Sequence, residues 1–503
     1  MKDFRDDKFI AAANLSNDGV AISVQPGKIS LASKTAANIS YPVTEFLKRY
    51  LKARVFDSTG VKVPAARQIV IPAVKYAYNP PFSERDVYYK SAFDDTFMRW
   101  NKVNHIWASK NSQWGNYVHT AYEFIDARKY IKSNPEYFAL VKNKRITSQL
   151  CYSNKEVYAI VLANLKEKIR RSPEKKIWSF SQLDNNDICQ CDLCMATDKR
   201  LETHGGPILE FVNRLAKDIP DKEISTLAYG FSLKPPPADK FRLEDNVIIV
   251  YCITQGNKGR DFSSDESFKD MRQFLTSWLK LTKKVIIWDY IVNFPNLLMP
   301  YPNFKGMAQA VNYYRRLGLR SIFLQGNIRK GGDFGDMRAY IASQLLWNPA
   351  ANMNELIAEY SDYAYGPASG EVQSLVKDLT ANGNKAFLNS YNAPKAFGHN
   401  MFTSDNMRAY HEKIDRALSK TSRGTPYYLN LMQIKLSFDI TDMDLLKNQN
   451  QGQSRALPGS ALKSKMADLE KYSTTGLLDI PVNENNRTVR DYINTSKKEL
   501  DKE

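Results

Sequence analysis

The stretch from Ile177 to Cys194, IWSFSQLDNNDICQCDLC, decides the fold class that the sequence predicts. Its apolar start is typical of a short buried strand, and an acidic, Asn-rich segment and three cysteines follow at once. Groups that follow a parallel strand in an α/β protein face the ligand-binding edge of the sheet. We therefore expect Asp184, Asn185 and Asp187 to be candidates for chemistry, or else an Asx-rich turn whose side chains bond their own backbone.

Four cysteines predict a structural cross-link close to this loop. Cys189, Cys191 and Cys194 form a C-x-C-x-x-C motif, and Cys151 stands upstream, just beyond another predicted strand. Three thiolates on one tight turn, with a fourth from a neighbouring loop, match the tetrahedral structural site that zinc prefers. Two disulfides, expected in an exported chain, or buried free thiols are the alternatives. In each case the cysteines would fix the loop that carries Asp184, so a structural Zn²⁺ is considered and no cofactor is predicted for catalysis.

The composition is that of a globular protein. The chain has 503 residues, of which 43% are hydrophobic and 12% aromatic, and a barrel of about 250 residues with smaller flanking domains fits this length. No apolar run approaches the roughly 18 residues of a membrane-spanning helix, so no transmembrane segment is predicted. The start, MKDFRDDKFI, lacks the apolar stretch of a signal peptide. This leaves a cytoplasmic protein or the mature form of an exported one.

The net charge of +17 comes from 71 Lys and Arg against 54 Asp and Glu. The basic residues are dispersed, and their densest cluster, KEKIRR at Lys166 to Arg171, has no aromatic stacking motif beside it. We therefore predict no nucleic-acid partner. An anionic glycan or another acidic surface would still be attracted.

Strand and helix patterns alternate along most of the chain. Residues 1–79 predict a small α/β domain with strands at ISLAS and RQIVIPA and a helix between them. Residues 80–350 predict a (β/α)8 barrel of the TIM type, because about eight strand signals alternate with helices. These signals include NHIWAS, from Asn104, and the segment Gln149 to Cys151. Residues 351–503 predict a helical C-terminal region.

The predicted strands end in polar or aromatic residues, which is what a sugar or another polar ligand would need along one rim. Candidate binding residues are Arg85, His119, Asn185, Tyr229, Trp288, Tyr290, Asn293 and Gln325. Asp289 lies among aromatic residues, and partial burial there would raise its pKa as a general acid requires. A packed histidine is the structural alternative for His119, and a carboxylate that bonds backbone amides is the alternative for Asp289.

An ordered set of motifs carries a resemblance to a known family. The motifs are VHT at Val118, NPEYFAL at Asn134, QLCYSN at Gln149, SQLDNNDICQCDLC at Ser181, TLAY at Thr226, WDYIVNF at Trp288, LQG at Leu324 and LLWNP at Leu345. From about Phe82 to Gly366 the chain thus resembles the bacterial family first catalogued as domain of unknown function 4838, of which glycoside hydrolase family 163 is a characterised branch. The resemblance implies a glycosidase of Bacteroidetes type in the periplasm or at the cell surface, its export signal removed. A glycan or glycoprotein would be its substrate.

The family 163 branch implies an endo-β-N-acetylglucosaminidase that cleaves the chitobiose core of complex N-glycans by a retaining, substrate-assisted mechanism. The 2-acetamido oxygen then attacks the anomeric carbon, so the protein supplies a proton donor and a group that orients the acetamide. Related hexosaminidase barrels, whose N-terminal domain is similar to residues 1–79, carry an Asp-Glu pair where this sequence has Asp184 and Asn185. Since Asn185 cannot donate a proton, we predict that Asp184, with Asn185, orients the acetamide and that Asp289 or Asp187 is the acid.

Other residues extend or weaken the resemblance. Arg85 occupies the place of a sugar-gripping arginine in hexosaminidases, and family 42 β-galactosidases are similar in combining an upstream cysteine with C-x-C-x-x-C. Leu324 stands where the family pattern commonly has an acidic residue, which favours a different substrate or a lost activity. The alternatives are therefore a catalytically silent glycan-binding barrel and a glycosidase for another, anionic sugar.

Overall fold

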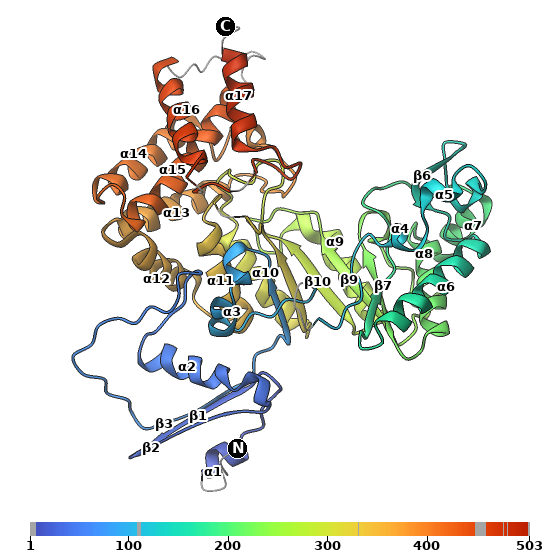
Figure 1. Cartoon of the computed structure of the whole chain (residues 1–503), viewed down its shortest axis with the longest axis horizontal. Helices are drawn as coiled ribbons and strands as arrows, with labels where there is room; N and C mark the ends of the chain where they lie inside the picture. The colour runs from blue at the N-terminus through green and yellow to red at the C-terminus, as the bar shows by residue number, and fades with distance from the viewer. Residues whose placement is uncertain are drawn as a thin grey trace.

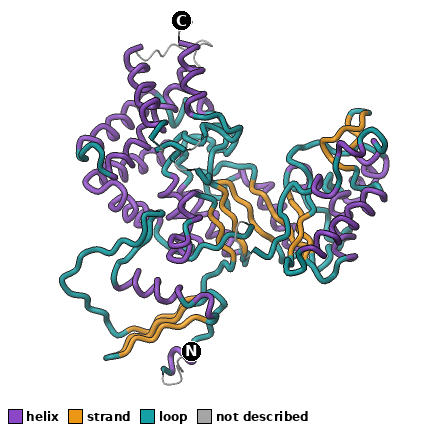
Figure 2. Tube along the Cα trace, viewed as in Figure 1, coloured by secondary structure: helices purple, strands orange, loops and turns teal. Residues whose placement is uncertain are grey.

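The computed structural model describes residues 7–107, 112–329, 331–447, 459–475, 477–479 and 481–500. Figure 1 shows three parts: an N-terminal sheet with one covering helix, a central parallel sheet with helices, and a C-terminal group of helices. Figure 2 shows that the strands lie in the first two parts and in one peripheral hairpin. Among the described residues no helix is long and apolar enough to cross a membrane.

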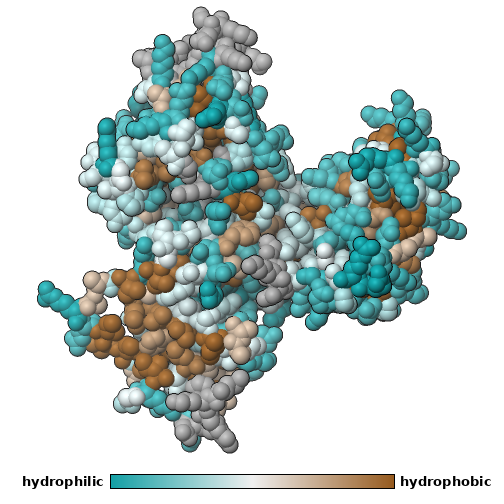
Figure 3. Space-filling model, viewed as in Figure 1, coloured by the Kyte–Doolittle hydropathy of each residue, from teal (hydrophilic) through white to brown (hydrophobic). Residues whose placement is uncertain are grey.

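The N-terminal part is an antiparallel sheet of three strands in the order β2-β1-β3, namely β1 (Val20–Gln25), β2 (Lys28–Ser33) and β3 (Val74–Tyr78). Helix α2 (Ser40–Tyr50) packs Phe46 against Ile22 and Val24 of β1, and α1 (Lys8–Ala12) precedes the sheet. The predicted strand at RQIVIPA is not formed: residues 67–73 have no regular secondary structure and lie just before β3. Apolar side chains gather on this part of the surface in Figure 3, and exposed ones include Val61, Val63, Ile69 and Val70.

The central sheet has six parallel strands in the order β4-β11-β10-β9-β8-β7. They are β4 (Glu84–Val87), β7 (Ile177–Ser179), β8 (Glu223–Ala228), β9 (Val247–Ile253), β10 (Val285–Tyr290) and β11 (Ser321–Gln325). The sheet is curled, so its order matches a barrel whose second and third strands are missing. The full (β/α)8 barrel that the sequence predicts is not confirmed.

In its described residues, 104–107, the segment predicted as a strand at NHIWAS forms no ladder, because a side chain takes a backbone bond there; residues 108 and 109 lie outside the described residues. Asp86 Oδ2 accepts the Ile106 N–H at 2.7 Å, and Asp86 Oδ1 lies 2.7 Å from His105 Nδ1. Only an isolated antiparallel bridge joins Asn104 to Arg85, and an isolated parallel bridge joins Trp114 to Ile177 of β7. These two contacts stand where the missing strands of a closed barrel would lie.

The predicted barrel strand at Gln149 to Cys151 belongs instead to a peripheral hairpin. Strands β5 (Phe138–Val141) and β6 (Lys144–Leu150) pair antiparallel, outside the central sheet. Lys142 and Asn143 connect them with φ of 47° and 63°, the two positive values that a tight type I′ hairpin turn needs. The motif NPEYFAL forms the 3-10 turn η3 (Pro135–Tyr137), and its last three residues begin β5.

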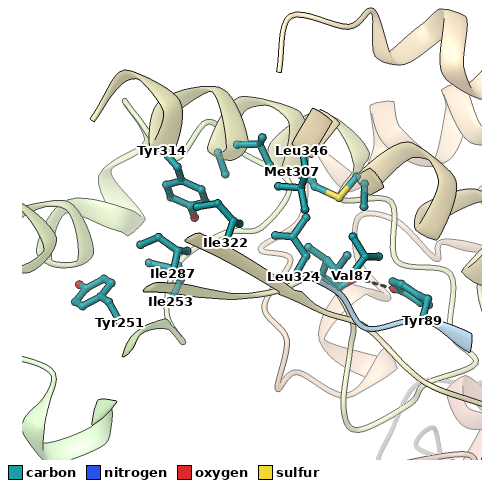
Figure 4. Close-up of a cluster of buried hydrophobic side chains, with 14 of the residues drawn as sticks. Val87, Tyr89, Tyr251, Ile253, Ile287, Met307, Tyr314, Ile322, Leu324 and Leu346 are labelled. Atoms are coloured by element: carbon teal, nitrogen blue, oxygen red, sulfur yellow. Dashed lines mark hydrogen bonds between the residues drawn. The ribbon is translucent and has the colours of Figure 1, made fainter. Parts of the chain in front are cut away.

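Helices cover one face of the central sheet, which we call the outer face. They are α6 (Lys155–Arg171), α8 (Gly206–Asp218), α9 (Lys269–Leu281), α10 (Phe304–Arg316) and α11 (Gly335–Trp347). Figure 4 shows the core between sheet and helices: Ile287 and Ile322 from the strands meet Met307 and Tyr314 of α10 and Leu346 of α11. The opposite, inner face carries a separate, aromatic-rich cluster.

The remaining elements connect these parts or form the C-terminal region. Short helices around the peripheral hairpin and before it are α3 (Asp95–Asn101), α4 (Ala121–Phe124), α5 (Ala127–Tyr130) and α7 (Asp192–Leu201). The C-terminal region contains α12 (Met353–Tyr365), α13 (Ser369–Gly383), α14 (Ser404–Ser419), α15 (Pro426–Lys447), α16 (Gly459–Ser473) and α17 (Val489–Leu500). In its described residues this region is helical, as predicted, while the division at 79/80 and 350/351 stays a prediction.

Candidate functional site

The inner face of the sheet is lined by aromatic side chains. Because successive residues of a strand point to opposite faces, Ile286, Trp288 and Tyr290 of β10 belong to the inner cluster while Ile287 packs on the outer face. The Trp288 ring centroid lies 5.2 Å from that of Trp107. Aromatic surfaces of this kind suit the apolar faces of a pyranose ring.

A cavity of about 450 Å³ opens at the β4 and β11 side of this face. Its lining includes Tyr88, Trp107, Tyr117, Trp288 and Gln325. The indole N–H of Trp288 donates to Gln325 Oε1 at 2.6 Å, whereas the buried indole N–H of Trp107 has no hydrogen-bond partner among the described residues. A buried donor without a partner is costly, and a ligand acceptor in the cavity would satisfy it.

Asp184 lies at the β7 and β8 side of the same face, in the loop that follows β7. Its carboxylate is exposed and accepts a hydrogen bond from the Tyr229 hydroxyl at 2.8 Å. Burial, followed by this hydrogen bond to Asp184, raises the pKa of Tyr229, so the phenol stays protonated and can only donate to the carboxylate. One oxygen of Asp184 is thereby fixed, and the carboxylate remains open to solvent.

His119 joins this pair from the loop before α4. Its Nδ1 lies 2.8 Å from the Gln182 carbonyl oxygen, so Nδ1 carries the donated proton, and its Nε2 lies 4.0 Å from Asp184 Oδ1. His119 has φ of 55°, a left-handed conformation that is unfavourable for a residue other than glycine. The Gln182 side chain also donates to the Tyr229 carbonyl oxygen at 2.9 Å, which ties the two loops together. The structure thus brings together three predicted site residues: Asp184, Tyr229 and His119.

Asn185 is held in the scaffold beside Asp184. Its Oδ1 accepts bonds from Gln149 Nε2 at 2.9 Å and from the Asp187 N–H at 3.1 Å, and its Nδ2 donates to the Ser148 carbonyl oxygen at 2.8 Å. All the polar atoms of this side chain are therefore used to join the loop to β6. Asn185 thus anchors the loop that carries Asp184 to β6, and Asp187 lies half-buried on the same turn.

Asp289 does not face the inner cluster. Its side chain is buried on the outer face, where it pairs with Lys258 Nζ at 2.7 Å and accepts from the Tyr314 hydroxyl at 2.8 Å. The Tyr290 N–H also donates to it at 2.8 Å. The strand alternation that points Trp288 and Tyr290 inward points Asp289 outward. This placement is that of the structural alternative, a carboxylate that bonds buried donors, and we do not retain Asp289 as the acid.

Arg85 and Asn293 also lie apart from the ligand-facing surface. Arg85 is completely buried and donates to Asp18 Oδ2 at 2.8 Å and to the Lys102 carbonyl oxygen at 2.7 Å, so it joins the N-terminal part to β4. Asn293 is buried and donates to the carbonyl oxygens of Asn389 and Asn392 at 3.2 and 2.8 Å. Both side chains are occupied as connectors between segments, which strand-end position alone could not reveal.

Tyr290 and Tyr391 lie on the inner face between the cavity at Trp107 and the loop that carries Asp184. Tyr290 is buried, and its ring centroid lies 6.3 Å from that of Tyr391, which is 44% exposed. Phe294 stands 5.4 Å from Tyr391 in the same aromatic group. Tyr391 comes from the C-terminal helical region, so this region contributes directly to the inner face.

Glu484 is a second carboxyl group beside the inner face, and no sequence motif identifies it. It lies in a turn before α17, and two backbone hydrogen bonds hold this turn against the segment after β10. The Glu484 N–H donates to the Phe294 carbonyl oxygen at 3.2 Å, and the Leu297 N–H donates to the Val482 carbonyl oxygen at 2.8 Å. Burial, followed by the charge of Asp184, raises the pKa of Glu484. The sequence offers little signal, since Glu484 is a single acid in the Asn-rich segment VNENNR, about 300 residues from Asp184.

The four predicted cysteines come together at the base of the Asp184 loop. The ligand atoms of Cys151, Cys189, Cys191 and Cys194 all lie within 4.8 Å of one another. Cys151 follows β6, Cys189 and Cys191 lie in the loop after β7, and Cys194 stands in the first turn of α7. The fifth cysteine, Cys252, is buried in β9, outside this cluster.

Comparison with protein families identifies the class of the chain. The model of the family described as Domain of unknown function (DUF4838) matches residues 55–377. This match covers more than half of the 503 residues, so the chain belongs to that family, as its motifs predicted. Comparison with curated proteins finds no match.

Several solved glycoside hydrolases resemble the chain. A Family 89 glycoside hydrolase from Clostridium perfringens in complex with PUGNAc gives a TM-score of 0.49 and 10% identity, covering 91% of this chain and 62% of that one. Its complex with the substrate GlcNAc-alpha-1,4-galactose gives a TM-score of 0.48 and 10% identity, covering 91% and 61%. A beta-N-acetylhexosaminidase gives a TM-score of 0.38 and 12% identity, covering 70% and 88%. The chain spans about three fifths of the length of the family 89 structures.

Proposed function

We propose that this chain is a glycoside hydrolase whose active site is the inner face of the central sheet. The observation that carries the proposal is the pairing of Asp184 with Tyr229, with Glu484 near enough for the charge of Asp184 to raise its pKa. Substrate-assisted cleavage of a glycosidic bond requires one group that orients the acetamide and one carboxyl acid that protonates the leaving oxygen, and Asp184 and Glu484 offer these two groups. The resemblance of the motifs to glycoside hydrolase family 163 supports the same reaction.

We assign the two carboxyl groups different roles. Asp184 accepts a hydrogen bond from the N–H of a 2-acetamido substituent and turns the acetamide carbonyl oxygen toward the anomeric carbon. Tyr229 holds Asp184 in place through its hydroxyl. Glu484, with its raised pKa, is the acid that protonates the leaving oxygen. This replaces Asp289 in the predicted mechanism, and Asp187 stays the alternative acid.

The shape of the inner face favours a substrate of several sugars. The cavity around Trp107 and Trp288 lies at the β4 and β11 side, and Asp184 lies after β7, at the far edge of the six-stranded sheet. A glycan that spans this face would stack on the aromatic rings and accept a bond from the Trp107 N–H while its scissile bond lies at Asp184. We therefore favour an endo-β-N-acetylglucosaminidase acting on complex N-glycans.

The experiment is incubation of the purified chain with a biantennary complex N-glycoprotein, with mass spectrometry of the released glycans. We expect glycans that end in a single reducing-end N-acetylglucosamine. Release of monosaccharides only would refute endo action, and a glycan that binds without any turnover would establish the silent glycan-binding alternative. A panel of uronic-acid and sulfated glycans in the same assay tests the alternative of an anionic substrate, which the net charge of +17 favours.

The acetamide mechanism has its own test. Replacing the acetamide of a cleaved chitobiose-type substrate by a trifluoroacetamide withdraws electrons from its carbonyl oxygen. If that oxygen is the nucleophile, kcat/KM falls strongly while binding changes little. An unchanged kcat/KM would mean that a protein carboxylate is the nucleophile, and Asp184 would then take that role.

A further inference from the structure

We propose that Cys151, Cys189, Cys191 and Cys194 hold one structural zinc ion that locks the Asp184 loop to the peripheral hairpin. The four thiols come from two separate segments, Cys151 after β6 and the stretch Cys189 to Cys194 after β7, yet their ligand atoms lie within 4.8 Å of one another. The inference does not depend on the proposed hydrolase activity, because it rests on this cluster alone.

The spacing of the sulfur atoms fits a tetrahedral metal site. With zinc–sulfur bonds of about 2.3 Å, two ligands of a tetrahedron lie about 3.8 Å apart. Cys151 Sγ lies 3.6 Å from Cys191 Sγ and 3.9 Å from Cys194 Sγ. The cluster therefore has the geometry of four ligands around one ion, and a small ion at its centre requires little movement of the backbone.

Hydrogen-bond donors and the start of a helix lie next to the sulfur atoms, and the deprotonated thiol is the form that binds zinc. The Leu140 N–H donates to Cys189 Sγ at 3.4 Å, and Arg145 Nη1 lies 4.0 Å from the same sulfur. Cys191 caps the amino end of α7 and Cys194 lies in its first turn, where the helix dipole favours negative charge. Three of the four cysteines are buried, so the site is closed to water and its ion would be structural.

The position of the site gives the ion a specific task. Residues 183–191 leave the sheet after β7 and reach the hairpin, where Asn185 bonds Gln149 and Ser148 and the Gln190 N–H donates to the Leu140 carbonyl oxygen at 2.7 Å. Zinc would add metal–sulfur bonds to these hydrogen bonds, from Cys151 on the hairpin side and from Cys189, Cys191 and Cys194 on the loop side. Loss of the ion would free the loop and with it the orientation of Asp184.

The first test is metal analysis of the wild-type chain purified without chelators, together with a count of thiols after denaturation with a chelator. We expect about one zinc per chain and all five cysteines as reactive thiols. Zinc-free protein that takes up no zinc after reduction and dialysis against the ion would overturn the proposal. So would a reduced thiol count, which indicates disulfides, or iron in place of zinc.

The second test compares two cysteine variants. Cys194→Ser removes a ligand and should lower the zinc content at least tenfold, whereas Cys252→Ser removes a buried cysteine outside the cluster and should leave it unchanged. Cobalt bound in place of zinc gives the wild-type chain and Cys252→Ser, but not Cys194→Ser, the absorption of a tetrahedral thiolate site. Equal metal content in the two variants would overturn the assignment. If Cys194→Ser does not fold, Cys191→Ser, at the half-buried position, replaces it.

Discussion

The substitution Asp289→Asn tests whether the Asp289 carboxylate stabilises the fold or takes part in catalysis. Asp289 and Lys258 are paired at 2.7 Å with side-chain exposures of 6% and 5%, so the substitution leaves a buried ammonium without its counter-ion. Removing one partner of such a pair costs about 3–5 kcal/mol. Deprotonating a lysine of ordinary pKa at pH 7 costs a similar amount, about 4.6 kcal/mol, which sets an upper limit to the penalty.

The pH dependence of this loss follows from Lys258. Burial already lowers the pKa of Lys258, and loss of Asp289 lowers it further. In the variant the unfolded chain binds more protons than the folded chain between the two pKa values, so the stability of the variant rises with pH there. From pH 7 to pH 9 the penalty should shrink by up to about 2.7 kcal/mol, which is two pH units at 1.36 kcal/mol each.

The assay is urea unfolding followed by circular dichroism at both pH values, with glycan release measured well below the unfolding midpoint. We expect a strong loss of stability at pH 7 and near wild-type turnover of the folded variant. A Lys258→Met, Asp289→Asn double variant should lose less stability than the two single variants added together, because the two residues contact each other. Wild-type stability combined with lost turnover would return Asp289 to the mechanism.

Two further predictions use carboxyl groups whose pKa values are shifted, Glu484 and Glu45. Burial and the charge of Asp184 raise the pKa of Glu484, so its acid form should be lost as pH rises through that pKa. Glu484→Gln should lower kcat by about 10²- to 10⁴-fold and remove the alkaline limb of the pH–rate profile. An unchanged profile would exclude Glu484 as the acid. At Glu45, burial is outweighed by Lys102, Lys48 and Arg49, which lower its pKa to about 2. Ionised Glu45 therefore stabilises the fold at pH values above its unfolded pKa, and this contribution should be lost as pH falls toward 2. The urea unfolding midpoint should therefore fall more steeply between pH 5 and pH 2.5 in the wild type than in Glu45→Gln. Equal falls in the two proteins would contradict this.

The sequence predicted the elements whose cause is local. The βα alternation of residues 80–350 is present in six parallel strands, because buried apolar runs between helices allow little else. The two missing barrel strands depend on contacts that a pattern does not contain. The carboxylate of Asp86 takes the backbone bond of Ile106, and the turn at Lys142 and Asn143 folds β6 back on β5.

Which side chains reach the inner face could be predicted for residues in loops, but not for residues within a strand, because the strand decides the orientation of its side chains there. Asp184, His119 and Tyr229 meet at one edge of the sheet, as their positions after predicted strands suggested. Asp289 stands at a strand end too, but the alternation of the strand points it into the outer core. Glu484 reaches the site only through the packing of the C-terminal region on the segment after β10, a long-range contact without a local signal.

The most direct measurement of the central claim is the rate of glycan release by Asp184→Asn beside Asp221→Asn. Asp221 is an exposed acid in the connection before β8, at the opposite end of the strands from Asp184. We predict that Asp184→Asn lowers kcat by about 10²-fold or more, the scale of a lost catalytic group, with an unchanged unfolding midpoint, and that Asp221→Asn releases glycans at the wild-type rate. Equal rates for the two variants would contradict the assignment of the active site to the inner face at Asp184.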